Sequence, residues 1–272
     1  MKKYIRWVGI VIAIPIVLFL LIVILLYCPP VQNWAVKRVA SYASQKMGMN
    51  ITVEKVKLVF PLDLGVEGVR VLQPNDSVTG QTDTIANVGK IVANVQLLPL
   101  FSSKVEVNEL SLHDVRMNTA NLVHEARIKG DVGLLLVQSR GVDLKSKTIR
   151  VNQAQLRDAN ISVELSDTVP PDTTKTPVYW KIKVDKLLVE RSKAMIRTAG
   201  DTMVVLAEMP KLEAKNGYFD LFKNLYRIET LNWQDGSVNY DLTHKPRTDG
   251  LDPNHIRLTH LDLGVDMPSS TK

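Results

Sequence analysis

Histidine is the side chain best suited to acid–base or metal chemistry near neutral pH, and this chain has five histidines. They are His113, His124, His244, His255 and His260. None lies in an HExxH motif, and the sequence has no GxSxG nucleophile turn and no P-loop. We expect His255 and His260 to flank a strand and to be exposed. The sequence therefore predicts a protein that is not an enzyme and that needs neither a metal nor a cofactor.

A short polar pattern points to covalent modification instead. Asp followed by Ser or Thr, and then by an apolar residue or Thr, occurs five times in segments that read as loops. The pattern resembles an O-glycosylation motif that one group of Gram-negative bacteria uses on exported proteins. Asp-Ser and Asp-Thr are also ordinary turn residues, so both interpretations stay open. The candidate acceptors are Ser77, Thr84, Thr168, Thr173 and Thr202.

The charge and the cysteine content narrow the class of protein further. The net charge is +6 and the pI about 9.3, but Lys and Arg are scattered among Asp and Glu with no basic block. A nucleic-acid partner is therefore not expected. The single cysteine, Cys28, ends an apolar run, so the rest of the chain forms no disulfide and does no thiol chemistry.

That apolar run, from Trp7 to Cys28, predicts one membrane-spanning helix. At about 1.5 Å per residue it covers the roughly 30 Å hydrocarbon core of a bilayer, and Trp7 and Tyr27 mark its two ends. A cleaved signal peptide has an apolar region of roughly 7–15 residues and a small-residue cleavage site. This run is longer and lacks such a site, so we expect an uncleaved anchor.

Charges beside the run predict its orientation. Lys2, Lys3 and Arg6 precede it and favour a cytoplasmic N-terminus, because basic residues are retained on that side. The long part after residue 30 would then lie outside the cytoplasm. We expect four segments: a cytoplasmic stub at 1–6, the span at 7–28, a juxtamembrane helix at 29–48 and a β domain at 49–272.

The segment after Pro29-Pro30 has the spacing of a short amphipathic helix. Its apolar residues recur at steps of four, three and four, from Val36 to Met47, and Gly48 follows as a helix stop. Its bulky and basic residues would suit the headgroup region of a membrane. Alternatively, its apolar stripe closes the end of the following domain, and both roles are compatible. The proposed membrane-surface contacts are Trp34, Lys37, Arg38 and Lys46.

From Ile51 onward the sequence changes to short alternating runs rich in Val, Ile and Leu. Such alternation, broken by turn residues, predicts half-buried antiparallel strands. Segments 73–84, 166–177 and 243–253 carry the Pro, Asp, Thr and Gly that are typical of loops. We expect roughly 14 strands spaced about 4.8 Å apart.

These strands repeat one template of apolar positions, in which steps of two residues alternate with steps of three. The complete copies are Val105, Val107, Leu110, Leu112, Val115, Met117; Ile149, Val151, Ala154, Leu156, Ala159, Ile161; Ile182, Val184, Leu187, Val189, Ser192, Ala194; and Tyr226, Ile228, Leu231, Trp233, Gly236, Val238. The shorter copies are Ile51, Val53, Val56, Leu58 and Ile256, Leu258, Leu261, Leu263. Steps of two keep side chains on one face of a strand, so each step of three has to be absorbed by the backbone.

We expect the first step of three to be a β-bulge, which bends and over-twists a strand. The second step of three is expected to be a tight hairpin turn, as Gln234-Asp235-Gly236 indicates. Curled hairpins of this kind would stack into a curved sheet with the apolar side chains on its concave face. The last repeat stops near Met267 with the template incomplete, so we expect the chain to be the N-terminal part of a longer protein.

With this organisation the chain resembles the AsmA-like proteins, and within them the N-terminal region of the TamB branch (translocation and assembly module subunit). The likeness runs over almost the whole chain. It rests on the anchor followed by PPVQNWAVKRVASYASQKMGMNITVEKVKLVFPLDLGVEGVRV, and then by IANVGKIVANVQLLPLFSSKVEVNELSLHDVRM. The Leu-Pro-Leu-Phe passage within 95–107 and the repeats themselves are typical of that group.

The resemblance implies a single-pass protein of the Gram-negative inner membrane, with its N-terminus cytoplasmic and the bulk of the chain periplasmic. It implies a mostly β fold in which one antiparallel repeat sheet forms a taco-like groove. It also implies a role in moving phospholipid toward the outer membrane. The TamB branch is linked to insertion of outer-membrane β-barrel proteins, together with an outer-membrane partner of the BamA or TamA type.

Two functions follow as hypotheses. In the first, the concave face is an open conduit that shields phospholipid acyl chains; the alternative is that the same residues form a conventional closed core. In the second, the protein is a scaffold whose exposed strand edges accept client polypeptides by β-augmentation. The residues expected to line a lipid groove are Val105, Val107, Leu110, Leu112, Val115, Met117, Ile149, Val151, Leu156, Ile161, Ile182, Val184, Leu187, Val189, Ile196, Ile228, Leu231, Trp233 and Val238.

Overall fold

The computed structural model of the chain describes residues 28–59, 63–74, 82–96, 106–119, 126–143, 146–166, 179–198, 200, 202–223 and 225–266. The cytoplasmic stub and all of the expected membrane span except Cys28 lie outside these residues. Across the part of the chain that is described, no helix is both long and apolar enough to cross a membrane. The anchor and its orientation therefore stay predictions.

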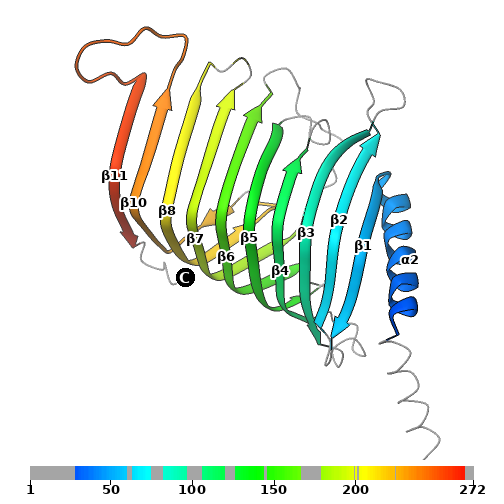
Figure 1. Ribbon diagram of the computed structural model, residues 1–272. Helices are drawn as coiled ribbons and strands as arrows, with labels where there is room; N and C mark the ends of the chain where they lie inside the picture. Colours follow the sequence, from blue (N-terminus) through cyan, green and yellow to red (C-terminus); the bar gives the residue numbers. More distant parts are fainter. Residues whose placement is uncertain are drawn as a thin grey trace, which may run out of the picture.

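One α-helix, α2, covers Pro29–Met47, where the spacing of apolar residues predicts it. Gly48 ends it in the left-handed conformation and donates its N–H to the carbonyl oxygen of Ser44. The Ser44 hydroxyl then joins helix to sheet, because it donates to the Ala40 carbonyl (2.7 Å) and accepts from the Ile51 N–H (2.9 Å). The helix packs along the first strand at one end of the sheet (Figure 1), as expected of a helix that closes the domain.

The remaining elements in the described residues are eleven strands of one sheet. They are β1 (Asn50–Val59), β2 (Asp63–Pro74), β3 (Thr82–Gln96), β4 (Glu106–Asn118), β5 (Ala126–Asp143), β6 (Thr148–Leu165), β7 (Lys181–Thr198), β8 (Val204–Asp220), β9 (Leu225–Arg227), β10 (Thr230–Asp241) and β11 (His255–Asp266). Their order follows the chain from β1 to β8 and then continues with β10 and β11, while β9 pairs with the end of β8.

The sheet is open and bent, with long strands that curve together (Figure 1). Neighbouring strands are antiparallel except β6 and β7, which are parallel. The expected mostly β class is therefore confirmed, but the sheet is mixed instead of wholly antiparallel. The described strands are also longer than expected, at up to 18 residues.

The expected β-bulge at the first step of three is confirmed in two strands. Asn94 of β3 faces Glu109 of β4, but the next residue of β3 faces Val107, so Asn108 is extra. The pairing of β5 with β6 shifts in the same way at Asn152. Both extra residues are polar, which fits a position where the ladder of backbone hydrogen bonds is interrupted.

The expected hairpin at the second step of three is wrong, because one continuous strand runs through each of these steps. β10, for example, includes all of Gln234-Asp235-Gly236. A single residue with positive φ takes the place of the turn: Asp235 (50°), and at the matching positions Asp114 (52°), Asp158 (53°) and Arg191 (46°). A single left-handed residue shifts the alternation of side chains between the two faces of the sheet, and the strand still continues in the same direction.

These left-handed residues, together with the residues that face them on neighbouring strands, form a row across the sheet, which we call the crease. Asp114 of β4 lies between Gly89 of β3 and Gly133 of β5, and Gly133 in turn faces Asp158 of β6. A Cβ on Gly133 would lie 3.0 Å from the Cβ of Asp158, so glycine makes room for the left-handed residue. The crease consists of Glu54, Gly68, Gly89, Asp114, Gly133, Asp158, Arg191, Pro210 and Asp235, and the left-handed His260 of β11 continues it slightly out of register, in contact with Asp235.

Apolar side chains gather beside the crease on the face that carries the template residues, which we call the inner face. Its most buried cluster is Val88, Val115, Val132 and Ala159, which are 3–8 % exposed. Partly buried residues packed against this cluster are Val69, Ile91, Leu112, Met117, Leu135, Leu156 and Ile161. Within the described residues no large side chain is less than 2 % exposed, so the inner face is apolar without being enclosed.

Candidate functional site

The inner face aligns the expected groove residues of different strands in rows. In one row each residue is the register partner of the next: Leu112, Leu135, Leu156, Val189, Leu212, Trp233 and Leu263. A parallel row consists of Leu110, Val137, Ala154, Leu187, Ala214, Leu231 and Val265. Because the rows run across the strands, apolar surface is continuous from β4 to β11.

Some expected groove residues are not placed in these rows. Val105 lies outside the described residues, and only the backbone of Val107 is described. Ile196 is described and is 41 % exposed near the end of β7. Sequence reasoning missed the inner-face residues of strands that run in the opposite direction, such as Val132 and Leu135 of β5. Val132 and Leu135 are separated by a step of three, as the template residues Leu156 and Ala159 that they face are. The template read in the reverse direction could therefore have identified them in the sequence.

An apolar hollow of about 70 Å³ lies on the inner face of β6, β7 and β8. Its lining is Ala154, Val184, Leu187, Ala214, Gly217, Phe219 and Ile228. A Cβ on Gly217 would lie 3.0 Å from the ring of Phe219, so glycine lets the ring lie across the strand. Since no lining side chain is polar, the hollow suits a hydrocarbon group better than a water molecule, which needs two to four polar partners.

The opposite, outer face of the same strands is charged and internally paired. Arg191 of β7 donates two hydrogen bonds to the carboxylate of Asp158 on β6, its neighbour along the crease, at 2.8 and 2.9 Å. These bonds hold the pKa of Asp158 below its ordinary value. Lys193 donates to Glu208 at 2.7 Å, and this bond lowers the pKa of that carboxyl group in the same way. The sheet is therefore amphipathic, with one face for water and one for apolar groups.

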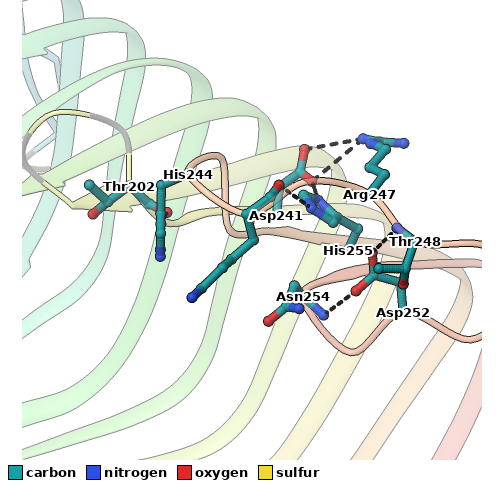
Figure 2. Close-up of polar contacts among 9 residues, drawn as sticks. Thr202, Asp241, His244, Arg247, Thr248, Asp252, Asn254 and His255 are labelled. Atoms are coloured by element: carbon teal, nitrogen blue, oxygen red, sulfur yellow. Dashed lines mark hydrogen bonds and ion pairs between the residues drawn. The ribbon is translucent and has the colours of Figure 1, made fainter.

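A polar cluster where β10 and β11 are joined was not expected from the sequence (Figure 2). The His255 ring hydrogen-bonds through Nδ1 to the Asp241 carboxylate, and its Nε2 lies 2.9 Å from the carbonyl oxygen of Lys245. Both partners are acceptors, so the ring has to donate from both nitrogens, which only the imidazolium form can do. The bond to Asp241 accordingly raises the pKa of His255, and the same bond lowers the pKa of Asp241.

The loop 242–254 is ordered around a second carboxylate. Asp252 is buried and accepts hydrogen bonds from the backbone N–H groups of Thr248 (3.0 Å) and Asn254 (2.9 Å), which lower its pKa. The loop also reaches the turn before β8, because the Thr243 N–H donates to the carbonyl oxygen of Thr202. The expected loop at 243–253 is thus confirmed, and we call Asp241, Lys245, Arg247, Asp252 and His255 the clasp.

The expectation for His255 and His260 needs correction. The side chain of His255 is only 8 % exposed, because both nitrogens are engaged in the clasp. His260 is exposed, but it lies inside β11 as a left-handed residue of the crease, 2.7 Å from the Asp235 carboxylate. In the described part of the chain no three potential metal ligands come together.

The structure describes two of the five candidate glycosylation sites. Thr84 is exposed, but it is paired with Leu72 inside β3, so its assignment to a loop was wrong. Thr202 lies in an exposed bend, and its hydroxyl group is 2.6 Å from that of Thr198. Ser77, Thr168 and Thr173 lie outside the described residues. Modification itself stays a prediction.

The candidate membrane-surface residues of α2 point to solvent where they are described. Trp34 is 68 % exposed, and Lys37 and Arg38 are exposed as well. The side chain of Lys46 is not among those described. An exposed tryptophan beside two cations fits a membrane surface, and that contact stays a prediction.

Comparison with models of protein families gave no match, and a search of curated proteins gave none either. The class of molecule is therefore defined by its own architecture. It is a mostly β protein with one open sheet, an apolar inner face, a charged outer face and a helix along one edge.

Proposed function

We propose that this chain is an inner-membrane-anchored, periplasmic protein of the AsmA-like type that carries phospholipid along a taco-like groove toward the outer membrane. The observation that carries the proposal is the continuous set of half-buried apolar rows on the inner face. A conventional core would bury its large side chains completely, and the described residues include no such side chain.

Physical chemistry explains why such a surface holds a lipid and still lets it move. Burial of apolar area is worth about 25 cal/mol per Å², and it has no preferred direction. An acyl chain lying across the rows therefore loses little when it slides from one strand to the next. The headgroup stays in water at the open side, so it adds no cost of burial.

The length and the attachment of the sheet fit transport between two membranes. In the part of the chain that the structure describes, ten strands lie side by side, and at about 4.8 Å per strand they give a path of roughly 45 Å. α2 lies against β1, directly after the expected membrane span, so the groove would begin near the inner membrane. The opposite end of the sheet, at β11, would point toward the outer membrane.

Photocrosslinking at two adjacent leucines tests the conduit. Leu187 lines the inner-face hollow, whereas Leu188 lies on the outer face of the same strand. We expect a photoreactive amino acid at position 187 of the full chain to form adducts with phospholipid in cells, detected by mass spectrometry. The same amino acid at position 188 is the matched control. Equal labelling at both positions, or none at 187, contradicts the proposal.

The second candidate is a scaffold for insertion of outer-membrane β-barrel proteins, working with a barrel-assembly partner of the BamA or TamA type. The observation in its favour is the edge strand β11. In the described residues α2 covers the edge at β1, but no strand pairs with the outer edge of β11. An unpaired edge can accept a client strand.

Crosslinking also separates the two functions. A photoreactive group at Leu258, which is 45 % exposed on β11, would capture client polypeptides if the scaffold function holds. Capture of polypeptide at Leu258 without phospholipid at Leu187 would favour the scaffold. Phospholipid at Leu187 without polypeptide at Leu258 favours the conduit.

A further inference from the structure

Exposed aromatic residues gather where β8 turns into β9. Phe222 is 53 % exposed, Tyr226 is 61 % exposed, and Leu225 between them is 49 % exposed. Tyr179, which precedes β7, is 45 % exposed and stacks on Phe222 with ring centroids 4.6 Å apart. We call Tyr179, Phe219, Phe222, Leu225 and Tyr226 the aromatic rim. A cluster of exposed apolar side chains of this kind is typical of a surface that contacts a ligand, a membrane or another protein.

Hydrogen bonds hold the described backbone that follows β8, at residues 221–223. Asp220 is only 2 % exposed and accepts hydrogen bonds from the Lys223 N–H (3.1 Å) and the Tyr218 hydroxyl (3.4 Å). The Leu221 N–H donates to the carbonyl oxygen of Trp180 (3.0 Å), which ties this turn to the start of β7. The exposed ring of Phe222 therefore stands on a hydrogen-bonded part of the turn.

Three lysines lie close to the rim along the chain or through backbone contact. The ammonium group of Lys147 lies 4.9 Å from the ring centroid of Tyr179, and the Lys181 N–H donates to the carbonyl oxygen of Lys147. Lys223 follows Phe222 directly, and all three lysines are exposed. Among the described residues of 146–148, 179–182 and 220–227, the one acid is Asp220, which is buried and hydrogen-bonded. The charge of the rim is thus complementary to an anion.

The rim is continuous with the apolar hollow. Phe219 lines the hollow on the inner face, and its ring lies 6.3 Å from that of Tyr226. A ligand with a charged head and an apolar tail would therefore meet cations and aromatic rings at the rim and hydrocarbon side chains immediately below. This order of surfaces, cation and ring and then hydrocarbon, is the one that membrane interfaces show.

We propose that the aromatic rim, with Lys147, Lys181 and Lys223, binds the headgroup of an anionic phospholipid while its acyl chain enters the hollow beside Phe219. The inference rests on the proposed lipid function and adds a headgroup preference and a place of entry to it. Lysine binds a phosphate group as a point charge, and basic residues strengthen contact with anionic lipids.

The test compares two headgroups on the full chain in detergent micelles. Photoactivatable phosphatidylglycerol, which is anionic, and phosphatidylcholine, which is zwitterionic, carry the reactive group in the acyl chain. We expect at least about tenfold stronger labelling of residues 219–227 by phosphatidylglycerol, and a decline of this preference with added salt. Inorganic phosphate should weaken the labelling no more than sodium chloride of the same ionic strength does, because a free anion lacks the apolar tail. Stronger competition by phosphate than by the matched sodium chloride would overturn the proposal in favour of a simple anion site.

Matched lysine variants give the decisive comparison. The variant Lys147→Gln/Lys181→Gln/Lys223→Gln should lose the headgroup preference, and the corresponding three Lys→Arg changes should keep it. Lys55→Gln/Lys90→Gln/Lys129→Gln removes the same charge from exposed positions elsewhere and should keep the preference. Equal loss in both Gln variants overturns the inference. If phospholipid still crosslinks at position 187 in that case, the proposed lipid conduit is retained and only the headgroup site at the rim is rejected. If no phospholipid crosslinks at position 187 in the otherwise unaltered chain, the conduit itself is rejected.

Discussion

At the scale of single residues, His255 is the side chain whose chemistry is most constrained. Two acceptors flank its ring, the Asp241 carboxylate and the carbonyl oxygen of Lys245. Arg247 adds a second cation beside Asp241, at 3.5 Å, while Asp252 lies in the same loop and favours the charged ring. The clasp is therefore an ionic unit that needs a protonated histidine.

The clasp should depend on pH in a defined direction. The raised pKa of His255 means that its contribution to stability is complete below the unfolded-state pKa of about 6.5 and is lost as pH rises through the folded-state value. The pKa of Asp241 is lowered, so its contribution is present above about 3.9 and is lost as pH falls through the folded-state value. We expect the clasp to be tightest between these two limits.

Amide hydrogen exchange of residues 242–254 as a function of pH measures this directly, once corrected for the intrinsic pH dependence of exchange. Protection should fall on the alkaline side in the unaltered chain. His255→Gln, which cannot become charged, should abolish the fall in protection on the alkaline side and leave the loop less protected. His260→Gln is the control, since this exposed histidine lies outside the clasp. An unchanged pH profile in His255→Gln would refute the ionic description.

At the scale of elements, the crease explains why the sequence predicted the faces of the strands but not their ends. Alternation is a local property, so Leu112, Leu156 and Val189 were correctly placed on one face with their neighbours. The kink at Asp235-Gly236 uses the same residue types as a hairpin turn, and nothing local separates the two outcomes. The pairing of β10 with β8 on one side and with β11 on the other, which keeps the strand continuous through Gln234-Asp235-Gly236, decides between them.

Two other features, the parallel strand pair and the clasp, could not be predicted because they depend on contacts between segments that are separated in sequence. The parallel pairing of β6 with β7 depends on how the chain returns between them, which no alternation pattern records. The clasp depends on His255 and Asp241 meeting across a loop, so their spacing in sequence gives no sign of it. The candidate groove could be predicted in part, because each template copy already fixes the face on which its residues lie.

The crease makes a prediction about glycine. In Gly133→Ala the new Cβ would lie 3.0 Å from the Cβ of Asp158, an atom that cannot move without its backbone. We expect a loss of about 1–3 kcal/mol in the free energy of unfolding, measured with urea. Gly264→Ala is the control, since nothing lies within 4 Å of its Cβ, and should be neutral or stabilising by about 0.5 kcal/mol. Equal effects of the two changes would rule out crowding at the crease.

A second prediction at this scale concerns the junction of α2 and β1. Ser44→Ala removes the hydroxyl group that bonds both Ala40 and Ile51, and the Ile51 N–H loses its side-chain acceptor. We expect faster hydrogen exchange at Ile51, by about tenfold, which corresponds to about 1.4 kcal/mol. Ser41→Ala, an exposed change one helical turn earlier, should leave that rate unchanged. A similar rate in both variants would show that the hydroxyl does not dock the helix.

At the scale of the whole molecule, the central question is whether the inner face is open to a ligand or closes on itself. The buried cluster of Val88, Val115, Val132 and Ala159 lies beside the crease, whereas some inner-face side chains near the strand ends are exposed. Val132 is 5 % exposed, whereas Ile196 is 41 % exposed toward the end of β7. An open groove therefore requires two kinds of apolar residue, those that hold the bend and those that face the lipid.

Charged substitutions distinguish these two kinds. Val132→Asp places a carboxylate inside the cluster beside the crease, where an unpaired charge costs several kcal/mol, so we expect cooperative unfolding to be lost. Ile228→Glu places a carboxylate at the edge of the hollow, where water can reach it, and the urea transition should persist. In that variant we expect phospholipid labelling at position 187 to disappear, because a fixed charge in an apolar path repels acyl chains. A protein whose inner face is a closed core would instead unfold with either substitution.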